Sequence, residues 1–354
     1  MRCVTITFMN KTMDANAWNN AILSLSQPHV LQSWSWGAFK ARHGWEANRM
    51  TWQEDERDPW AAAQVLTQQR SRLKLGYIPK GPLVDWEHRE HVIEMLETLE
   101  NVAKQESMIL LKIDPDVRKD TELGKSIMQL LKRRGWRPSF EQIQFPNTML
   151  LDIRPDLDTI LMDMKSKWRY NVRLAARRGV EVRVADRSEL SLLYDMYAET
   201  SERQAFIIRD EDYYLDAWRT FMDDGLATPL LAEVKDEPVA MLVLFHFGTW
   251  AWYMYGASLE KHRRCMPSHR LQWEAIRHAK DLGCETYDLW GAPDELKESD
   301  PMWGVYRFKV GFGAEFAPHI GAYDYAPHRL LYRAYAFLRP RWVAFAHRRY
   351  WNNH

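Results

Sequence analysis

Hydrophobic positions along the chain follow two alternating periods. Short apolar and aromatic runs, such as Met108–Ile113 and Val180–Val184, predict buried strands. Apolar residues three or four positions apart predict amphipathic helices, as in Glu87–Gln105 and His269–Leu282. Strands and helices alternate over roughly the first 150 residues, and the alternation begins again at Val180. The pattern therefore predicts a mixed fold of the α/β (α+β) class.

Further elements complete this alternation. A strand and a helix are predicted within residues 1–26. Other strands are predicted at Ala61–Thr67, Leu73–Pro79, Thr148–Ile153, Pro229–Val234, Val239–Phe247, Ala251–Ser258 and Thr286–Trp290, and other helices at Glu122–Arg134, Leu190–Arg203 and over a segment ending at Met222. Because side chains alternate along a strand, we expect Tyr253 and Tyr255 to share one sheet face, either as packing residues or as part of a site.

The length of the chain favours two domains. At 354 residues it is long for a single hydrophobic core. We predict one domain over residues 1–155, a second over residues 156–325, and an aromatic, arginine-rich tail over residues 326–354. We expect the tail to pack back on the first domain, with a membrane surface as the alternative.

Composition and charge narrow the class of protein. The sequence is 46% hydrophobic and 27% charged, as in ordinary soluble proteins, and its formal net charge is zero, so polyanions would have to bind at local patches. Cys3, Cys265 and Cys284 show neither metal spacing nor an even disulfide set, which fits a reducing cytoplasm and no metal site. We see no signal peptide and no apolar run long enough for a membrane helix.

A strand, a polar loop and a short helix are predicted around Trp290–Gly313. Ser299 and Asp300 offer a helix N-cap, and Gly311 is expected to end the helix in a left-handed conformation. Lys309 would lie in the last turn, where the helix dipole helps to keep it protonated. We interpret Lys309 either as a cation that stabilises an anion or as a solvated helix cap.

Four residues in the first half of the chain are also candidates. Trp36 and Lys40 are one helical turn apart and could stack on a ligand and contact a phosphate, or they could pack on a sheet. A turn stiffened by prolines presents Lys80. Asp114 follows a buried strand, a position suited to acid–base chemistry and also common for helix caps.

A basic cluster with interleaved aromatic residues lies in the segment Asp156–Arg178. Its six cations fall in a stretch without acidic residues: Lys165, Lys167, Arg169, Arg173, Arg177 and Arg178. In a protein of zero net charge such a cluster predicts an anionic partner such as RNA. The alternative is a solvated basic helix whose aromatic residues face the core.

Seven motifs together resemble the FemABX family of non-ribosomal peptidyltransferases, which build peptidoglycan cross-bridges. In family order they are LQSWSWGAFK, YIPKGP, LKIDP, MKSKWRYNVRLAARRGV, AWYMYGAS, DLWGAPDE and YRFKVGFG. The resemblance implies two tandem domains of the GNAT-like (acyl-CoA N-acyltransferase) fold. The long helical hairpin of some family members has no counterpart in this sequence, so we expect the compact form without a coiled-coil arm.

The resemblance also implies an activity and its partners. An amino acid would pass from aminoacyl-tRNA to an amine on the stem peptide of a cell-wall precursor, either UDP-MurNAc-pentapeptide or lipid II. We expect a monomeric cytoplasmic enzyme that needs no cofactor and works at the inner face of the membrane, with peripheral membrane contact.

Family positions map onto individual residues of this chain. Around the precursor's diphosphate and stem peptide the resemblance places Lys40, Arg209, Tyr213, Tyr253 and Tyr255. Trp36, Lys80 and Phe308 are also predicted to bind the substrate. Asp114 matches the family's strand-end acid, and Lys309 matches the lysine of the transfer step. Ile109 replaces a substrate-side tyrosine of the compact form, which bears on the identity of the acceptor.

The implied chemistry is aminolysis of an ester. Lys309 would stabilise the tetrahedral oxyanion or the departing ribose oxygen. A lysine-type amine has a pKa of about 10.4, so its proton must be removed, either by Asp114 or by the substrate itself.

Two other functions remain open from the sequence alone. An acyl-CoA-dependent N-acyltransferase shares the fold but usually needs a glycine-rich loop for the CoA pyrophosphate, and Lys261–Arg270 contains no glycine. A non-catalytic RNA- or membrane-binding protein would use the basic cluster and the tail, but it leaves Asp114 and Lys309 unexplained.

Overall fold

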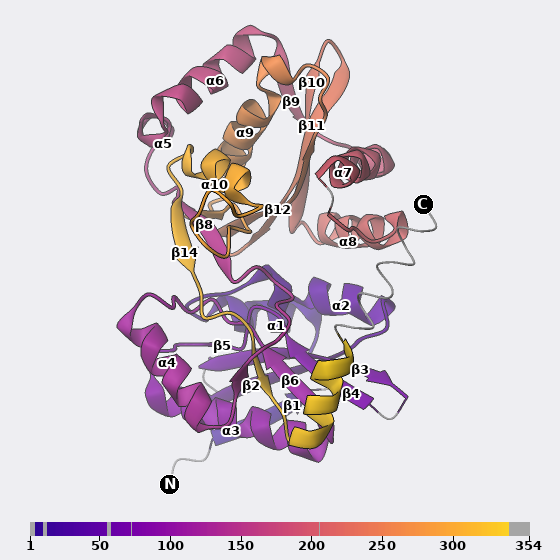
Figure 1. The fold of residues 1–354 in the computed structure, drawn as a ribbon, viewed down its shortest axis with the longest axis vertical. Coiled ribbons are helices and arrows are strands. Elements are labelled where there is room, and N and C mark those ends of the chain that lie inside the picture. Colours follow the sequence, from indigo (N-terminus) through magenta and orange to yellow (C-terminus); the bar gives the residue numbers. More distant parts are fainter. Residues whose placement is uncertain (1–3, 10–12, 55–57, 72, 205, 340–354) are drawn as a thin grey trace. The chain divides into compact units, whose positions relative to one another are not determined.

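The chain divides into two compact units. The computed structural model describes residues 4–9, 13–54, 58–71, 73–204 and 206–339. Unit 1 comprises Met1–Gln27, Leu31–Gln144 and His319–His354, and unit 2 comprises Pro28–Val30 and Phe145–Pro318 (Figure 1). Cys3 and residues 340–354 of the predicted tail lie outside the described residues.

Unit 1 is built on a mixed sheet. Its strands are β1 (Val4–Met9), β2 (Glu46–Glu54), β3 (Ala61–Arg70), β4 (Leu73–Ile78), β5 (Leu83–Val84), β6 (Met108–Ile113), β7 (Arg137–Pro138) and β15 (Tyr323–Tyr325). They lie in the order β1-β2-β3-β4-β6-β15-β7, and β5 pairs with β3. Strands β4 and β6 are parallel, whereas the other pairs are antiparallel.

The helices of unit 1 pack on this sheet. They include α1 (Ala15–Leu23), α2 (Trp34–Arg42), which follows the 3-10 turn η1 (Val30–Gln32), α3 (Arg89–Gln105) and α4 (Glu122–Arg133). Leu96 and Leu99 of α3 and Leu131 of α4 are fully buried with Trp52 of the sheet. Thr121 caps α4 by accepting a hydrogen bond from the backbone of Gly124 at 3.0 Å.

Unit 2 contains the second sheet. Its strands are β8 (Asn147–Asp152), β9 (Val180–Val184), β10 (Ala227–Val234), β11 (Glu237–Phe247), β12 (Trp250–Ser258), β13 (Thr286–Asp288) and β14 (Glu315–Pro318), in the order β14-β8-β13-β12-β11-β10-β9. Only β12 and β13 are parallel among these described strands. The predicted boundary after residue 155 falls beyond β8, a strand that pairs with β13 and β14.

Helices cover both faces of the second sheet. They are α5 (Leu157–Asp163), α6 (Ser166–Arg177), α7 (Leu190–Gln204), α8 (Glu211–Asp223), α9 (Pro267–Asp281) and α10 (Trp303–Val310), with 3-10 turns η2 (Arg187–Glu189) and η3 (Arg263–Cys265). Helices α5, α6, α9 and α10 lie on one face, and α7 and α8 lie on the other (Figure 1). A hydrophobic core of unit 2 forms under α9, where Leu244, Ile276, Tyr287 and Phe312 are fully buried.

The parallel pair of each sheet positions a carboxylate. Helix α3 precedes β6, and helix α9 joins β12 to β13. Asp114 follows β6 directly, and Asp288 is the last residue of β13. Each unit thus carries an aspartate at the carboxyl end of a parallel strand, the edge at which open α/β sheets commonly bind ligands.

The predicted elements around Trp290 need correction. Strand β13 ends at Asp288 instead of Trp290, because Trp290 turns into the left-handed region with a φ of 63°. Asp300 does not cap α10 directly; its Oδ1 accepts a hydrogen bond from Met302 N at 2.8 Å in the turn before the helix. The strands predicted at Met108–Ile113 and Val180–Val184 are confirmed with the same bounds.

A β-bulge separates Tyr253 from Tyr255, so the prediction that they share one sheet face is wrong. The register of β11 and β12 shifts between Val243 and Leu244, which pair with Tyr255 and Tyr253. Tyr253 packs against the core under α9, whereas Tyr255 contacts Trp218 of α8. One extra residue in the bulged strand reverses the alternation on which the prediction rested.

Gly311 is required by close packing and not by a left-handed conformation. Its φ is −66°, so the predicted left-handed ending of α10 is wrong. A Cβ at this position would lie 2.0 Å from Cε2 of the Trp168 ring. The Trp168 ring is held there by a hydrogen bond from its Nε1 to the carbonyl of Phe308 at 2.9 Å.

The C-terminal part of the chain returns to unit 1. Strand β15 pairs with β6 and β7, and residues 329–339 are helical. In the described part of the predicted tail, Tyr332 donates a hydrogen bond to Asp324 of β15 at 3.0 Å.

Candidate active site

Lys309 is a buried cation on two backbone carbonyls. Its Nζ donates to the oxygen of Trp290 at 3.0 Å and to the oxygen of Gly291 at 2.6 Å. Only 4% of the residue is exposed, and Nζ lies 5.9 Å from the centroid of the Tyr253 ring. The two carbonyls account for two of the three N–H groups of a protonated lysine. The interpretation of Lys309 as a solvated helix cap is therefore wrong.

Burial decides the charge of this lysine. Loss of water around Nζ lowers the pKa of Lys309 to about 7, and the negative charge of Asp288 opposes this change. Desolvation thus acts against the protonated state that the dipole of α10 was predicted to favour. An ammonium with a pKa near neutrality can both stabilise an anion and give up a proton.

Asp288 shapes the turn that holds Lys309, although the sequence did not single it out. Its Oδ1 accepts hydrogen bonds from Trp290 N at 2.7 Å and from the hydroxyl of Thr148. The first of these bonds fixes the left-handed backbone at Trp290, which points the carbonyls of Trp290 and Gly291 at Nζ. The motif DLWGAPDE contained this residue, but only the turn shows what it does.

The surroundings of Lys309 are aromatic. Phe308 packs against His269 and Phe312, with ring centroids 5.3 Å and 5.1 Å apart. Burial lowers the pKa of His269 to about 4, with a smaller contribution from the charge of Lys167. The His269 ring is therefore neutral at physiological pH and adds no positive charge beside Phe308.

A second group of predicted residues lies near α8. The guanidinium of Arg209 lies 4.5 Å from the ring centroid of Tyr213. Burial raises the pKa of Tyr255 well above its usual value, and the nearby Tyr213 contributes to the same direction. Arg209 is exposed, so this group can contact a ligand through its guanidinium. Because of the bulge, Tyr255 belongs to this group, whereas Tyr253 belongs with Lys309.

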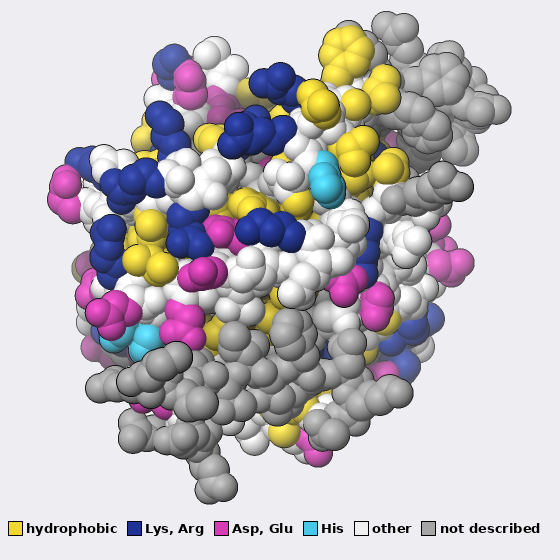
Figure 2. Space-filling model, turned by 90° about the horizontal axis from the view of Figure 1, so that it is seen from below, with side chains coloured by type: hydrophobic (Ala, Val, Ile, Leu, Met, Phe, Trp, Pro, Cys, Tyr) yellow, Lys and Arg dark blue, Asp and Glu magenta, His cyan; other side chains and the backbone are white. Residues whose placement is uncertain are grey.

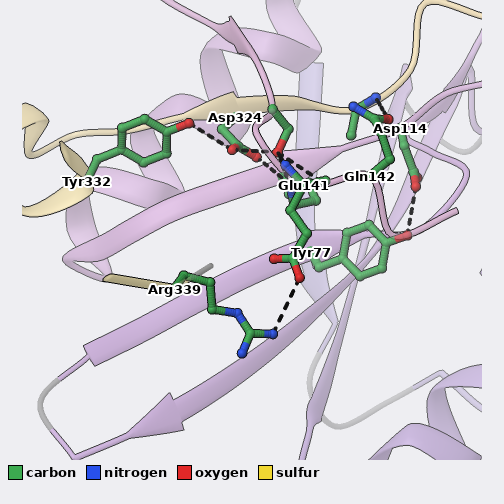
Figure 3. Close-up of polar contacts among 10 residues, drawn as sticks. Tyr77, Asp114, Glu141, Gln142, Asp324, Tyr332 and Arg339 are labelled. Atoms are coloured by element: carbon green, nitrogen blue, oxygen red, sulfur yellow. Dashed lines mark hydrogen bonds and ion pairs between the residues drawn. The ribbon is translucent and has the colours of Figure 1, made fainter. Parts of the chain in front are cut away.

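Asp114 is held by the strand and turn before it. The hydroxyl of Tyr77 donates to its Oδ2 at 2.7 Å (Figure 3), and the backbone N–H of Lys80 donates to its Oδ1. Both carboxyl oxygens of Asp114 thus accept a hydrogen bond within unit 1, and the residue is 4% exposed. Tyr77 was part of the motif YIPKGP, but its role needed the parallel pairing of β4 with β6.

Burial also dominates the titration of Asp114. Desolvation raises the pKa of this carboxyl to about 7, while the positive charge of Lys80 and the hydrogen bond from Tyr77 act in the opposite direction. A carboxyl that titrates near neutrality suits a general base, one of the two routes of proton removal predicted from the sequence. Its bonds to Tyr77 and Lys80 also make it a structural part of the turn.

Lys80 is not presented to solvent by its turn. It is 6% exposed, and its Nζ forms an ion pair with Asp116 Oδ1 at 2.7 Å. His319 Nδ1 lies 3.3 Å from the same oxygen, and burial lowers the pKa of His319 to about 4. Asp116 and His319 were missed because nothing in their local sequence distinguishes them.

Trp36 and Lys40 lie on one face of α2, as their spacing predicted. The Nζ of Lys40 lies 5.9 Å from the Trp36 ring centroid and 5.4 Å from that of Trp45. Lys40 is only 8% exposed and Trp36 only 7%. Their proposed contacts with a ligand stay a prediction. Lys40 belongs to unit 1 and Arg209 to unit 2, so their sharing of one diphosphate also stays a prediction.

The basic cluster separates into exposed and structural residues. Lys165, Lys167, Arg173, Arg177 and Arg178 are exposed on or beside α6. Arg169 instead donates to the carbonyls of Met162 and Met164 at the end of α5. Because these carbonyls terminate a helix, Arg169 stabilises α5 and is less available to an anionic ligand.

The aromatic residues of the cluster also divide. Trp168 faces the core and bonds to α10, whereas Tyr170 is 56% exposed. The core-facing alternative therefore holds for Trp168, and Tyr170 is the aromatic side chain of α6 that a base could stack on.

Comparisons with known proteins agree over most of the chain. A model of the FemAB family matches residues 16–235 and 225–339. The lipid II:glycine glycyltransferase of Staphylococcus aureus (strain USA300) is 25% identical over 387 residues, covering 88% of this chain and 91% of that protein.

Solved structures match the fold. The crystal structure of FemX aligns with a TM-score of 0.83 at 23% identity, covering 92% of this chain and 99% of the other. A tandem GNAT protein from the clavulanic acid biosynthesis pathway aligns with a TM-score of 0.55 at 11% identity, covering 91% and 98% of the two chains. The prediction of two tandem GNAT-like units is thus confirmed.

Asp114→Asn tests the buried carboxyl through the pH dependence of stability. The pKa of Asp114 in the folded protein is about 7 and exceeds the ordinary 3.8, so the folded protein keeps this proton at pH values where the unfolded chain loses it. The bound proton therefore stabilises the folded state, and this stabilisation is lost as pH rises from about 4 to 7. The Asn variant has no such proton, so its stability relative to the parent should increase over this range by up to about 4 kcal/mol. Urea unfolding at a series of pH values measures the difference.

Tyr77→Phe is the matched control for this experiment. This substitution removes a hydrogen bond that favours the carboxylate of Asp114, so the pKa of Asp114 should rise further. The pH range over which the protein loses stability should then extend to higher pH. Parallel pH profiles for Asp114→Asn and the parent protein would contradict a raised pKa at Asp114.

Proposed function

Because the chain belongs to the FemAB family, as its motifs predicted, we propose that it transfers an amino acid to an amine on the stem peptide of a peptidoglycan precursor. The donor is an aminoacyl-tRNA. The acceptor is the lipid-linked precursor, in keeping with the similar lipid II:glycine glycyltransferase. Such a transfer forms the cross-bridge of the cell wall.

The observation that carries the chemistry is the buried ammonium of Lys309. It is held by the carbonyls of Trp290 and Gly291 with one N–H group left over, and only 4% of the residue is exposed. A donor in such surroundings interacts strongly with a developing negative charge, since little water competes for it. Lys309 is thus suited to an oxyanion that exists only during the reaction.

The reaction breaks an ester and forms an amide. The amine nitrogen attacks the carbonyl carbon of the aminoacyl ester, and the carbonyl oxygen becomes an oxyanion to which Lys309 donates. When the intermediate collapses, the bond to the ribose oxygen breaks, and Lys309 supplies the proton that this oxygen takes up. The proton lost by the attacking nitrogen restores Lys309. A lysine with a pKa of about 7 can perform both steps near neutral pH.

The amine must first lose its ammonium proton. Asp114 titrates in the right range, but both of its oxygens already accept hydrogen bonds. Proton transfer assisted by the substrate requires no carboxylate. The two routes differ in their sensitivity to Asp114→Asn, which abolishes the first and leaves the second.

The turn before α9 argues against an acyl-CoA donor. A CoA pyrophosphate needs free backbone N–H groups at this helix start. Here Pro267 has no N–H, and the N–H groups of Cys265 and Met266 donate to the carbonyls of His262 and Arg263. The absence of glycine in the sequence of this loop thus has a structural counterpart in the described residues.

The donor proposal rests on α6. Its exposed cations follow one helix with an exposed tyrosine among them, an arrangement that suits a phosphate backbone with a base to stack. A solvated basic helix would show the same exposure, so binding to RNA is the property to measure.

A transfer assay with purified full-length protein tests the function. We expect a precursor pentapeptide incubated with charged tRNA to gain the mass of one or more aminoacyl residues. Acetyl-CoA supplied in place of charged tRNA should yield no product. Acetylation of the precursor, or no transfer from any charged tRNA, would overturn the proposal.

Replacing Lys309 should affect turnover more than binding. We expect Lys309→Met to lower single-turnover transfer by about 10²-fold or more, the scale of losing one oxyanion donor, with little change in substrate affinity. The rate of the parent enzyme should fall as pH rises above about 7, where Lys309 loses its proton.

Arg307→Met is the matched control, because Arg307 is an exposed cation on the same helix. Arg307→Met should leave the rate of single-turnover transfer and the substrate affinity unchanged. Weaker substrate binding at normal turnover in Lys309→Met would assign Lys309 to binding instead of catalysis.

The exposed cations of α6 should govern RNA affinity. Replacing Lys165, Lys167 and Arg173 with Ala should weaken tRNA binding and reduce its salt slope by about one unit for each lost phosphate contact. Precursor binding should remain. The control replaces Lys132 and Arg133, exposed cations of α4, with Ala. Equal effects of the two sets on tRNA binding would exclude α6 as the RNA surface.

A further inference from the structure

The helical segment 329–339 is anchored to unit 1 through one face. Tyr332 donates to Asp324 Oδ2 at 3.0 Å, and Arg339 Nη2 lies 3.5 Å from Glu141 Oε1 (Figure 3). The ring of Phe140 lies 6.2 Å from that of Tyr332 and 6.0 Å from that of Tyr335. Positions 332, 335 and 339 follow helical spacing, so they define the inner face of the segment.

The anchor reaches the interior of the sheet. Asp324 is 1% exposed on β15, where its Oδ1 forms an ion pair with Lys112 of β6 at 2.8 Å. Ser139 donates to Asp324 Oδ2 at 2.8 Å, next to the hydroxyl of Tyr332. A buried carboxylate with this many partners holds its ligands in a defined geometry. The orientation of the segment about its own axis is therefore set by the inner face.

The opposite face of the segment is apolar and exposed. We call it the apolar stripe, and its exposed fractions are 79% for Leu330, 52% for Leu331, 61% for Phe337 and 55% for Leu338. Their spacing of one, seven and eight positions puts them on one side of a helix. Four large hydrophobic side chains in one stripe form the kind of patch that marks an interaction site.

Positive charge flanks the apolar stripe. Arg329 and Arg333 are both exposed in the same segment. Residues 325–354 contain six arginines and no aspartate or glutamate, although the whole chain has zero formal net charge. Figure 2 shows a face of the molecule on which hydrophobic side chains lie at the surface beside lysine and arginine side chains. The partner of such a surface has to be both apolar and negatively charged.

We propose that the apolar stripe docks on the surface of an anionic lipid bilayer. The leucines and Phe337 enter the boundary between headgroups and acyl chains, and Arg329 and Arg333 pair with lipid phosphates. The helices among the described residues are too short or too polar to cross a bilayer. The choice of a membrane as the partner rests on the proposed function, because the acceptor proposed there is lipid-linked. The exposure of the stripe does not depend on the proposed function.

Vesicle sedimentation with the full-length protein, without substrates, tests the docking. We expect binding to vesicles of phosphatidylglycerol and phosphatidylethanolamine, and weak binding to vesicles of phosphatidylcholine. Leu330→Ser with Phe337→Ser, and Arg329→Glu with Arg333→Glu, should each lower the partition coefficient by about tenfold or more. Added salt should weaken the binding of the parent protein and leave little further loss for the arginine variant.

Matched controls carry the same changes elsewhere. Met162→Ser with Leu296→Ser removes two exposed apolar side chains of unit 2, and Lys132→Glu with Arg133→Glu reverses two exposed charges of α4. Both controls should bind vesicles like the parent protein. Equal losses in the controls and the stripe variants would overturn the proposal.

Other occupants of the stripe give different results. If a second copy covers it, the Leu330 and Phe337 variant changes the oligomeric state in solution and not vesicle binding. If residues 340–354 cover it, neither pair of substitutions changes vesicle binding. Either result overturns the proposal.

Activity separates this proposal from the proposed function. Transfer to the soluble UDP-linked pentapeptide should be unchanged in the stripe variants, while transfer to the lipid-linked precursor in vesicles should fall about tenfold with vesicle binding. Vesicle binding without transfer to either acceptor supports the docking and refutes the enzyme. Transfer to both acceptors without vesicle binding by the parent protein refutes the docking alone.

Discussion

The carbonyls of Trp290 and Gly291 determine what unit 2 can do, because they hold an ammonium where water is excluded. Three separate features serve that contact. Asp288 fixes the left-handed turn, the short strand β13 ends directly before this turn, and Trp168 packs against Gly311 at the end of α10. The positions of Lys309 and of its two acceptors therefore depend on a small, closely packed assembly.

The two units use burial in opposite directions and reach similar pKa values. Desolvation raises the pKa of Asp114 to about 7 and lowers that of Lys309 to about 7. An acid and a base that both titrate near neutrality can exchange protons with a substrate at little cost, as amide formation from an ester requires. Each lies at or against the carboxyl end of a parallel strand, so the same fold supplies both environments.

The basic residues of the chain differ in the contacts that they make and in the partners that they suit. The exposed cations of α6 suit a polyanion, whereas Arg329 and Arg333 flank an apolar stripe and suit a lipid surface. Arg169 and Arg339, which look the same in the sequence, instead bond to a helix end and to Glu141. Burial and hydrogen-bond partners, and not residue type, distinguish these roles.

The sequence by itself determined most of the periodic elements and, for some of them, the residues at their ends. Met108–Ile113 and the aspartate after it could be predicted, because period and composition are local properties. Tertiary structure decided the rest. The pKa of Lys309 depends on water excluded by distant residues, the separation of Tyr253 from Tyr255 depends on a pairing shift with β11, and the need for Gly311 arises from Trp168, far away in the chain. Such properties belong to contacts between segments, which no local pattern encodes.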